Sequence, residues 1–164
     1  MAPESAIFRL RHLHLAVHFF EELSGPMISR RQSVMVAEVA LPLTKIVALK
    51  PTDILRIAVE QMSEKRLGIC CVVSEEMMLA GVLTDGDIRR ILLREHKPIA
   101  ALFLADISTY MTPNPKVVNE SMSLEYAISL IETADVYDLP VIDTSGHLTG
   151  LLHVHSALKY LLSL

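Results

Sequence analysis

Hydrophobic and polar positions in this chain follow a pattern that recurs 69 residues later. Residues 47–93 can be laid over residues 116–162 without a gap. Identical residues then coincide, among them Leu55 with Leu124, Ala58 with Ala127, Val72 with Val141, Gly81 with Gly150 and Leu83 with Leu152. A gapless register of this length is stronger evidence than any single motif. We therefore expect two copies of one structural unit.

Each copy contains the same order of predicted elements. Apolar residues at spacings of three and four predict helices, and short apolar runs bounded by turn residues predict strands. The first copy has strands at 46–49, 69–74 and 79–83 and helices at 53–65 and 86–96; the second has strands at 116–119, 139–143 and 148–152 and helices at 124–134 and 154–162. One unit of about 55 residues buries too little apolar surface to be stable alone. We therefore expect an α+β fold in which two β-α-β-β-α repeats pack as a pseudo-symmetric pair.

Polar residues before the helices are candidate N-caps. Thr52 or Asp53 is expected to cap the first helix of the first copy, and Ser121 or Ser123 the corresponding helix of the second. Residues 98–110 are expected to link the two copies and to contain a short helical turn.

The two hairpin turns differ at one position. Gly146 lies where the second turn is expected to need a positive φ, which glycine adopts without steric cost. The first copy has Met77 at that position. Its turn must therefore differ in detail or carry some strain.

The segment before the repeats is expected to form a helix and a connector. Apolar spacing predicts a helix over residues 4–23, which Gly25-Pro26 ends. His14 and His18 are one turn apart and could hold a metal ion, but no third ligand is placed to complete a site, so a solvated helix face is preferred. The domain limits we predict are 1–35 for the N-terminal helix and connector, 36–105 for the first repeat and 106–164 for the second.

Composition narrows the classes of function. The chain is 51% hydrophobic and its mean hydropathy is +0.40, so either the core is well filled or a partner covers an apolar surface. No uncharged apolar run reaches the ~18 residues that a membrane span needs, and no secretory signal is recognisable. The net charge is −4 and the 15 Lys and Arg residues are dispersed, which argues against nucleic-acid binding. We expect a cytoplasmic protein without a membrane or nucleic-acid partner.

The only cysteines, Cys70 and Cys71, are adjacent in an apolar run. Neighbours on a strand point to opposite faces, so a disulfide between them is not expected. We prefer packing as small apolar residues in a reducing compartment. A redox site is the alternative, but the Cys-x-x-Cys spacing is absent.

A candidate site lies where a predicted strand ends at about Thr84 and a helix begins. Thr84 is a natural N-cap, and Asp87 is placed to reach back in a capping box. Such a helix start exposes backbone N–H groups and suits a phosphate. From the residues alone, a capping role and a ligand-binding role both remain open.

Residues from about 36 to 164 resemble a tandem pair of CBS domains (cystathionine-β-synthase-type domains). The resemblance is carried by the Gly-x-x-Thr-x-x-Asp turn at 81–87, by Tyr110-Met111-Thr112-Pro113 and by the stretch 138–150. In ligand-binding members the Thr meets phosphate or ribose, the Asp accepts hydrogen bonds from ribose hydroxyls, and apolar strand residues sandwich the base. The resemblance implies a site with Thr84 and Asp87 at the sugar and phosphate and with Ile46 and Val47 at the base. Arg89 or Arg90 could add positive charge for the phosphate, while a solvated helix face is the alternative for both arginines. We name Arg90 as the candidate.

Residues 84–90 and 150–155 also resemble the C-terminal CBS pair of bacterial D-arabinose-5-phosphate isomerases, which feed Kdo synthesis for lipopolysaccharide. Those enzymes carry an N-terminal sugar-isomerase (SIS) domain. Residues 1–35 are too few to form it, although they resemble a degenerate end of it. The resemblance implies that this chain is not itself an enzyme, while its full-length relative would be an isomerase.

The second copy departs from the family pattern at its turn. The acidic residue expected at the last position is Ser156. His153 and His155 share one face and could contact an anionic sugar or phosphate, serve a structural role or hold a metal; all three interpretations stay open. We name His153, His155 and Ser156 as a second candidate site and predict neither a metal nor a catalytic residue.

Two hypotheses of function follow. The first is a non-catalytic regulatory module that binds an adenine nucleotide such as AMP or ATP, or a sugar nucleotide such as CMP-Kdo, and that uses no cofactor. The alternative is a purely structural oligomerisation module without a ligand. CBS pairs commonly associate through their helices, so the resemblance also implies a homodimer.

Overall fold

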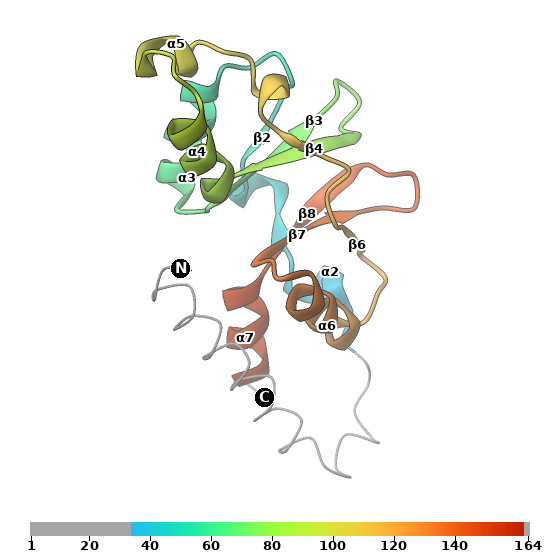
Figure 1. The fold of residues 1–164 in the computed structure, drawn as a ribbon. Helices are drawn as coiled ribbons and strands as arrows, with labels where there is room; N and C mark the ends of the chain where they lie inside the picture. Colours follow the sequence, from blue (N-terminus) through green and yellow to red (C-terminus); the bar gives the residue numbers. More distant parts are fainter. Residues whose placement is uncertain (1–33, 163–164) are drawn as a thin grey trace.

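The computed structural model describes residues 34–162 (Figure 1). The predicted N-terminal helix, with His14 and His18, lies outside the described residues, as does most of the predicted segment 1–35. No helix among the described residues is both long and apolar enough to span a membrane.

The predicted β-α-β-β-α order is confirmed in both copies. The first copy contains β2 (Ala48–Leu49), α3 (Leu55–Lys65), β3 (Ile69–Val73), β4 (Leu79–Thr84) and α4 (Asp85–Arg94). The second contains β6 (Val118–Asn119), α6 (Leu124–Ala134), β7 (Asp138–Ile142), β8 (Leu148–His153) and α7 (Val154–Leu162). The 69-residue register holds for most of these limits.

Each sheet is completed by a short strand from outside its own copy. A short helix α2 (Val36–Val39), β1 (Leu41–Pro42) and a 3-10 turn η2 (Leu43–Lys45) precede the first copy; α5 (Ile99–Phe103), η3 (Ile107–Thr109) and β5 (Thr112–Pro113) follow it. The sheet orders are β2-β3-β4-β5 and β1-β8-β7-β6. The strand before the first copy therefore joins the second sheet, and the strand after it joins the first.

Three clusters of buried side chains hold the molecule together. One lies between the first sheet and its helices, one between the second sheet and its helices, and one between the two sheets. Strand β3 contributes to two of them because successive side chains alternate between its faces. Cys70 points to the helices, whereas Cys71 points into the cluster between the sheets.

The cysteines are packed as the sequence predicts. Both are free and buried. Burial raises the pKa of the Cys70 thiol to about 12, and burial also raises the pKa of Cys71. Both side chains are therefore neutral thiols at physiological pH, and a reactive thiolate is not formed.

The hairpin turns of the two copies lie next to each other. Gly146 has the predicted positive φ, 91°, and Met77 adopts a similar conformation with φ 64°, so the expected strain is present at Met77. The turns then pair with each other: Leu148 N–H donates to the Met77 carbonyl (2.9 Å), and Leu79 N–H donates to the Gly146 carbonyl (3.4 Å). The constrained turns therefore join the two copies.

One predicted cap is confirmed and another is wrong. Ser123 caps α6, and its hydroxyl accepts from Tyr126 N–H. Neither Thr52 nor Asp53 caps α3, whose N-cap is Ile54 without a side-chain bond. The first N–H of the helix, from Leu55, donates instead to the carbonyl of Ala105 at 2.9 Å. Tertiary contact thus replaces the local cap.

Gly81 and Gly150 should be required for stability because an edge strand crosses each of them closely. A Cβ at Gly81 would lie 2.8 Å from the Thr112 carbonyl oxygen, and one at Gly150 would lie 2.6 Å from that of Leu41. We expect Gly81→Ala and Gly150→Ala each to lower the free energy of unfolding by about 1–3 kcal/mol in urea titrations.

Gly86→Ala is the matched control. Its Cβ would meet neighbours at an ordinary 3.5 Å, and Gly86 lies within α4 at a negative φ. Alanine is the better helix former, so this variant should be as stable as the parent or more stable. Equal losses in all three variants would contradict the proposed role of the strand crossings.

Candidate functional site

The turn from β4 into α4 forms the predicted capping box. Thr84 N–H donates to Asp87 Oδ2 at 2.8 Å, and the Thr84 hydroxyl donates to the same oxygen at 2.7 Å. Asp87 N–H in turn donates to the Thr84 hydroxyl oxygen at 3.2 Å. Both residues are therefore fixed by reciprocal bonds before any ligand is considered.

Asp87 is the one charged side chain that is buried among the described residues, with 8% of its surface exposed. Its other oxygen, Oδ1, accepts from Arg90 Nη2 at 2.5 Å. Burial alone would raise the pKa of Asp87, but the bonds from Thr84 and Arg90 outweigh it and hold the pKa below its ordinary value. The network thus adds stability that is present above pH about 3.9 and is lost as the pH falls through the lowered pKa of the folded state.

The Asp87 carboxylate has limited capacity left for a ligand. A carboxylate offers about four acceptor positions, two on each oxygen. Both positions on Oδ2 are used by Thr84, and Arg90 uses one on Oδ1. One position therefore remains while Arg90 is bound. The Arg90 side chain is 57% exposed, so it can move away and free a second.

The predicted base contacts are both buried in this structure. Val47 is 1% exposed and belongs to the cluster between the first sheet and its helices, and Ile46 is 5% exposed in the cluster between the sheets. Their contact with a base stays a prediction.

In the second copy, the corresponding turn carries a chain of three side chains. His153 lies opposite Asp138 in the β7–β8 ladder, and His153 Nδ1 is 2.7 Å from Asp138 Oδ1. His155 Nδ1 is 3.0 Å from His153 Nε2. The structure thus brings the two predicted histidines together, while Ser156 lies three positions beyond the strand end in α7 and is half-buried.

Asp138 was not among the predicted site residues. Asp138 could have been found only from the register of the hairpin, which places the first residue of β7 opposite the last residue of β8. Among the described residues, no group of three or more His, Cys, Asp or Glu side chains is arranged so that it could hold a metal ion.

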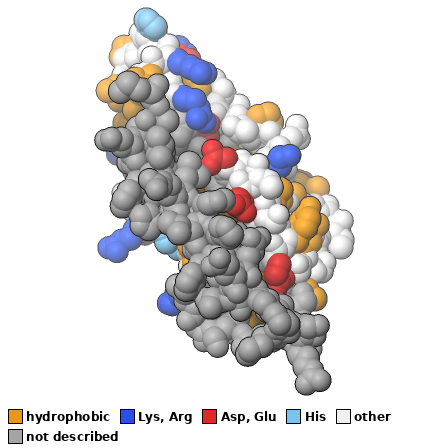
Figure 2. Space-filling model, turned by 60° about the horizontal axis from the view of Figure 1, so that its bottom comes forward, with side chains coloured by type: hydrophobic (Ala, Val, Ile, Leu, Met, Phe, Trp, Pro, Cys, Tyr) orange, Lys and Arg blue, Asp and Glu red, His pale blue; other side chains and the backbone are white. Residues whose placement is uncertain are grey.

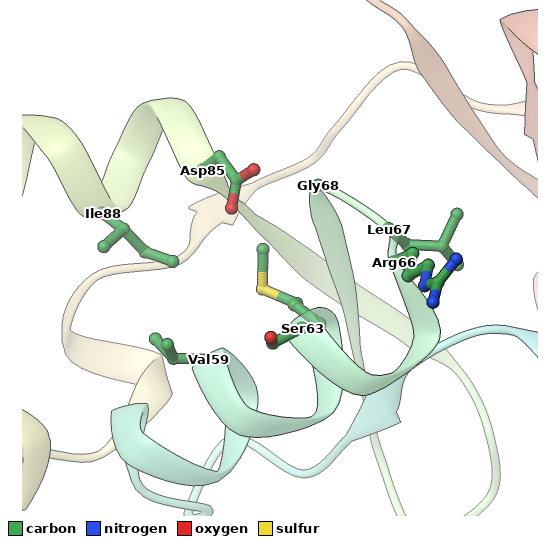
Figure 3. Close-up of a pocket in the computed structure, with 8 residues that line it drawn as sticks. Val59, Ser63, Arg66, Leu67, Gly68, Asp85 and Ile88 are labelled. Carbon is green, nitrogen blue, oxygen red and sulfur yellow. The ribbon is translucent and has the colours of Figure 1, made fainter.

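A separate cavity of about 350 Å³ lies between α3 and α4 (Figure 3). Asp85 and Ile88 line it from α4, while Val59 and Ser63 line it from α3. The side chains of Thr84, Asp87 and Arg90 do not line this cavity. It therefore lies on another face of α4 from the capping-box network and was not predicted from the sequence.

Among the residues that Figure 2 does not draw in grey, charged side chains do not gather into one basic patch. Lys, Arg, Asp and Glu are instead dispersed among apolar and uncharged groups there. This view agrees with the dispersed charge in the sequence.

Known relatives match this chain over most of its length. An uncharacterised protein of Chlamydia pneumoniae is 30% identical over 156 residues, which are 93% of this chain and 46% of that protein. Arabinose 5-phosphate isomerase KdsD of Escherichia coli K12 is 29% identical over 135 residues, which are 82% of this chain and 40% of the enzyme. The chain thus spans less than half the length of these relatives.

Solved structures share the fold. CBSX2 in complex with AMP is similar with a TM-score of 0.71 and 28% identity, over 79% of this chain and 97% of that one. A CBS domain-containing protein of Bacillus anthracis is similar with a TM-score of 0.72 and 18% identity, over 84% of this chain and 99% of that one, which supports the fold alone.

The family model for the CBS domain matches residues 36–94 and again residues 104–163. These two matches cover both copies of the repeat that the sequence predicts and the structure contains. The chain therefore belongs to the CBS domain family and carries two CBS domains in tandem.

Proposed function

We propose that this chain is a non-catalytic regulatory module that binds a nucleotide at the turn formed by Thr84, Asp87 and Arg90. The observation that carries the proposal is the buried Asp87 carboxylate, which is held ionised at the start of a helix. Such a group accepts hydrogen bonds from vicinal ribose hydroxyls. Ile46 and Val47 are the proposed contacts to the base.

Arg90 couples recognition of the phosphate to recognition of the ribose. While Arg90 bonds Asp87 Oδ1, the carboxylate can accept one ribose hydroxyl. A ligand phosphate attracts the exposed guanidinium, and its departure frees the position that a second hydroxyl needs. A nucleotide with a phosphate is therefore the better ligand for this turn than a nucleoside.

The similar structure that carries AMP supports a nucleotide as ligand class. For this chain, we propose an adenine nucleotide (AMP or ATP) or a sugar nucleotide such as CMP-Kdo. The similarity to arabinose 5-phosphate isomerase supports the second choice and a role within, or derived from, an isomerase of the Kdo and lipopolysaccharide pathway. The module would act in the cytoplasm, and catalysis would belong to a separate SIS domain.

A second candidate function is oligomerisation without a ligand. Large apolar side chains are exposed on α4, on α5 and directly after α5: Leu92, Leu93, Ile99 and Leu104. Such a surface fits a second copy of this chain, because association buries it from water. In this alternative a homodimer forms through these helices.

Replacing Asp87 should weaken nucleotide binding. We expect Asp87→Ala to weaken binding of AMP, ATP or CMP-Kdo, whichever binds the parent, by at least about tenfold in calorimetry, because loss of a charged hydrogen-bond partner costs roughly 1.5–3 kcal/mol. Asp85→Ala removes an exposed carboxylate from the same helical turn and should leave affinity unchanged. Equal affinity of the parent and Asp87→Ala, with both folded, would rule out the proposed site.

Arg90→Ala should separate phosphate from ribose recognition. The variant loses the phosphate partner but frees Asp87 Oδ1, so AMP should bind roughly tenfold more weakly. Adenosine should bind as well as to the parent, or better. Arg89→Ala is the control, since Arg89 is exposed and neighbours Arg90 in the same helix. A parallel loss of AMP and adenosine affinity in Arg90→Ala would contradict the proposed coupling.

Leu93→Glu should dissociate a homodimer held by the exposed helices. Leu93 is 83% exposed, so the fold of one chain does not depend on it. Light scattering should show a dimer for the parent and a monomer for the variant. Tyr126→Glu, on the exposed face of α6, should remain dimeric. An unchanged mass for Leu93→Glu would exclude this surface as the dimer contact.

A further inference from the structure

Met78 lies at the contact between the two hairpin turns, which lie side by side (Figure 1). Two backbone hydrogen bonds join the turns, one made by the residue before Met78 and one by the residue after it: Met77 accepts from Leu148, and Leu79 donates to Gly146. Met78 therefore stands opposite His147 in an isolated antiparallel bridge. Its side chain is placed between the only two residues of the first turn that bond the second turn through the backbone.

The thioether of Met78 fills the space next to the Gly146 Cα. A Cβ placed on Gly146 would lie 2.9 Å from Met78 Cε and 3.9 Å from Met78 Sδ. The methyl group of Met78 thus occupies room that a side chain of Gly146 would otherwise take. Because this group is apolar, it packs on the backbone of the other copy as a van der Waals contact between the turns.

Solvent nevertheless reaches the Met78 side chain, which is 40% exposed. Among the described residues, two other methionines are exposed to a similar extent, Met35 at 41% and Met122 at 37%, but both lie outside the hairpin turns. The remaining described methionines are half-buried or buried. Met78 therefore combines access to small solutes with a contact between the two copies.

The cysteines do not compete with Met78 for an oxidant. Peroxides react with thiolates, and burial raises the pKa of both thiols, so Cys70 and Cys71 stay neutral and enclosed. A thioether has a free electron pair at every pH and needs no deprotonation. Its oxidation requires only that the oxidant reach the sulfur.

We propose that Met78 is a peroxide-sensitive modification site that controls how firmly the two hairpin turns are joined. The sulfur electron pair attacks one oxygen of hydrogen peroxide, the O–O bond breaks, and the other oxygen leaves as water. The product is methionine sulfoxide, in which the sulfur has given up two electrons. A methionine sulfoxide reductase reverses the step with two electrons from a dithiol, which becomes a disulfide, and releases one water.

The sulfoxide no longer fits the contact with Gly146. It carries a strongly polar oxygen that needs water or a hydrogen-bond donor, so the oxidised side chain turns toward solvent. The apolar contact between the turns is then lost, and the two hydrogen bonds beside it open more often. The buried cluster between the sheets still holds the copies together. Oxidation therefore loosens the junction without unfolding the pair, and it does so independently of the nucleotide site proposed for the first copy.

Hydrogen exchange of the Leu148 amide, followed by nuclear magnetic resonance on the full chain, tests this proposal. The protein is treated with hydrogen peroxide until mass spectrometry of its peptides shows one added oxygen on Met78. Exchange at Leu148 should then become about tenfold faster. The Cys71 amide, which donates to the Val47 carbonyl inside the first sheet, should keep its rate. Treatment with a methionine sulfoxide reductase should restore slow exchange at Leu148.

Matched variants separate Met78 from the other methionines. Met78→Leu keeps an apolar side chain of similar volume that peroxide does not oxidise, so exchange at Leu148 should stay slow after treatment. Met122→Leu removes an equally exposed methionine elsewhere and should respond to peroxide as the parent does. Met78→Gln places a polar side chain at the junction and should show fast exchange without peroxide.

Three results would overturn the proposal. The first is slow exchange at Leu148 in protein that carries the sulfoxide at Met78. The second is a response to peroxide that persists in Met78→Leu. The third is oxidation of Met35 and Met122 under conditions that leave Met78 unmodified.

Discussion

The structure depends on burying both faces of its two central hairpins. Every residue of β3 is buried, with one set of side chains against the helices and the alternate set against the opposite sheet. A single copy could cover only one of these faces. The sheet of the second copy covers the other face. The two copies therefore form one unit rather than two independent domains.

The exchange of edge strands strengthens this dependence. Strand β1, which precedes the first copy, pairs with β8 of the second copy. Strand β5, which follows the first copy, pairs with β4 of the first copy. Each sheet is therefore closed by a short strand from outside its own copy. Both crossings place a proline beside a glycine: Pro42 pairs with Gly150, and Pro113 pairs with Gly81. Proline suits an edge strand because it has no N–H group that needs a partner in the ladder. The glycine opposite has no side chain, so the carbonyl of the residue before the proline can approach it closely. Identical residues at Gly81 and Gly150 thus reflect one shared geometric demand.

Much of this architecture could be predicted from the sequence because each helix and strand occurs twice, so that an unclear pattern in one copy could be interpreted from the other. The limits of α6 and α7 match the prediction, and those of β3 and β8 differ by one residue at one end. The parts that were missed lack a local signal. Strands β1 and β5 have two residues each and therefore no periodicity, and the start of α3 is satisfied by the carbonyl of Ala105 rather than by its own cap.

The candidate sites show the same division. Thr84 and Asp87 could be predicted because a capping box lies within three residues of sequence. Asp138 could not, because its partner His153 is 15 residues away and is reached only through the register of a hairpin. The bond between Asp87 and Arg90 was equally hidden, since helical spacing allows it but does not require it.

The two turns can differ in chemistry because each hydrogen-bond network is local. Thr84, Asp87 and Arg90 lie within one helical turn and its cap, while Asp138, His153 and His155 occupy one strand pair and the residues after it. Neither network contributes the large apolar side chains that fill the three clusters. A substitution in one turn therefore leaves the packing of the pair intact. The cluster between the sheets is one of the contacts that join the copies, and Cys71 in that cluster lies near enough to Asp138 to sense its charge.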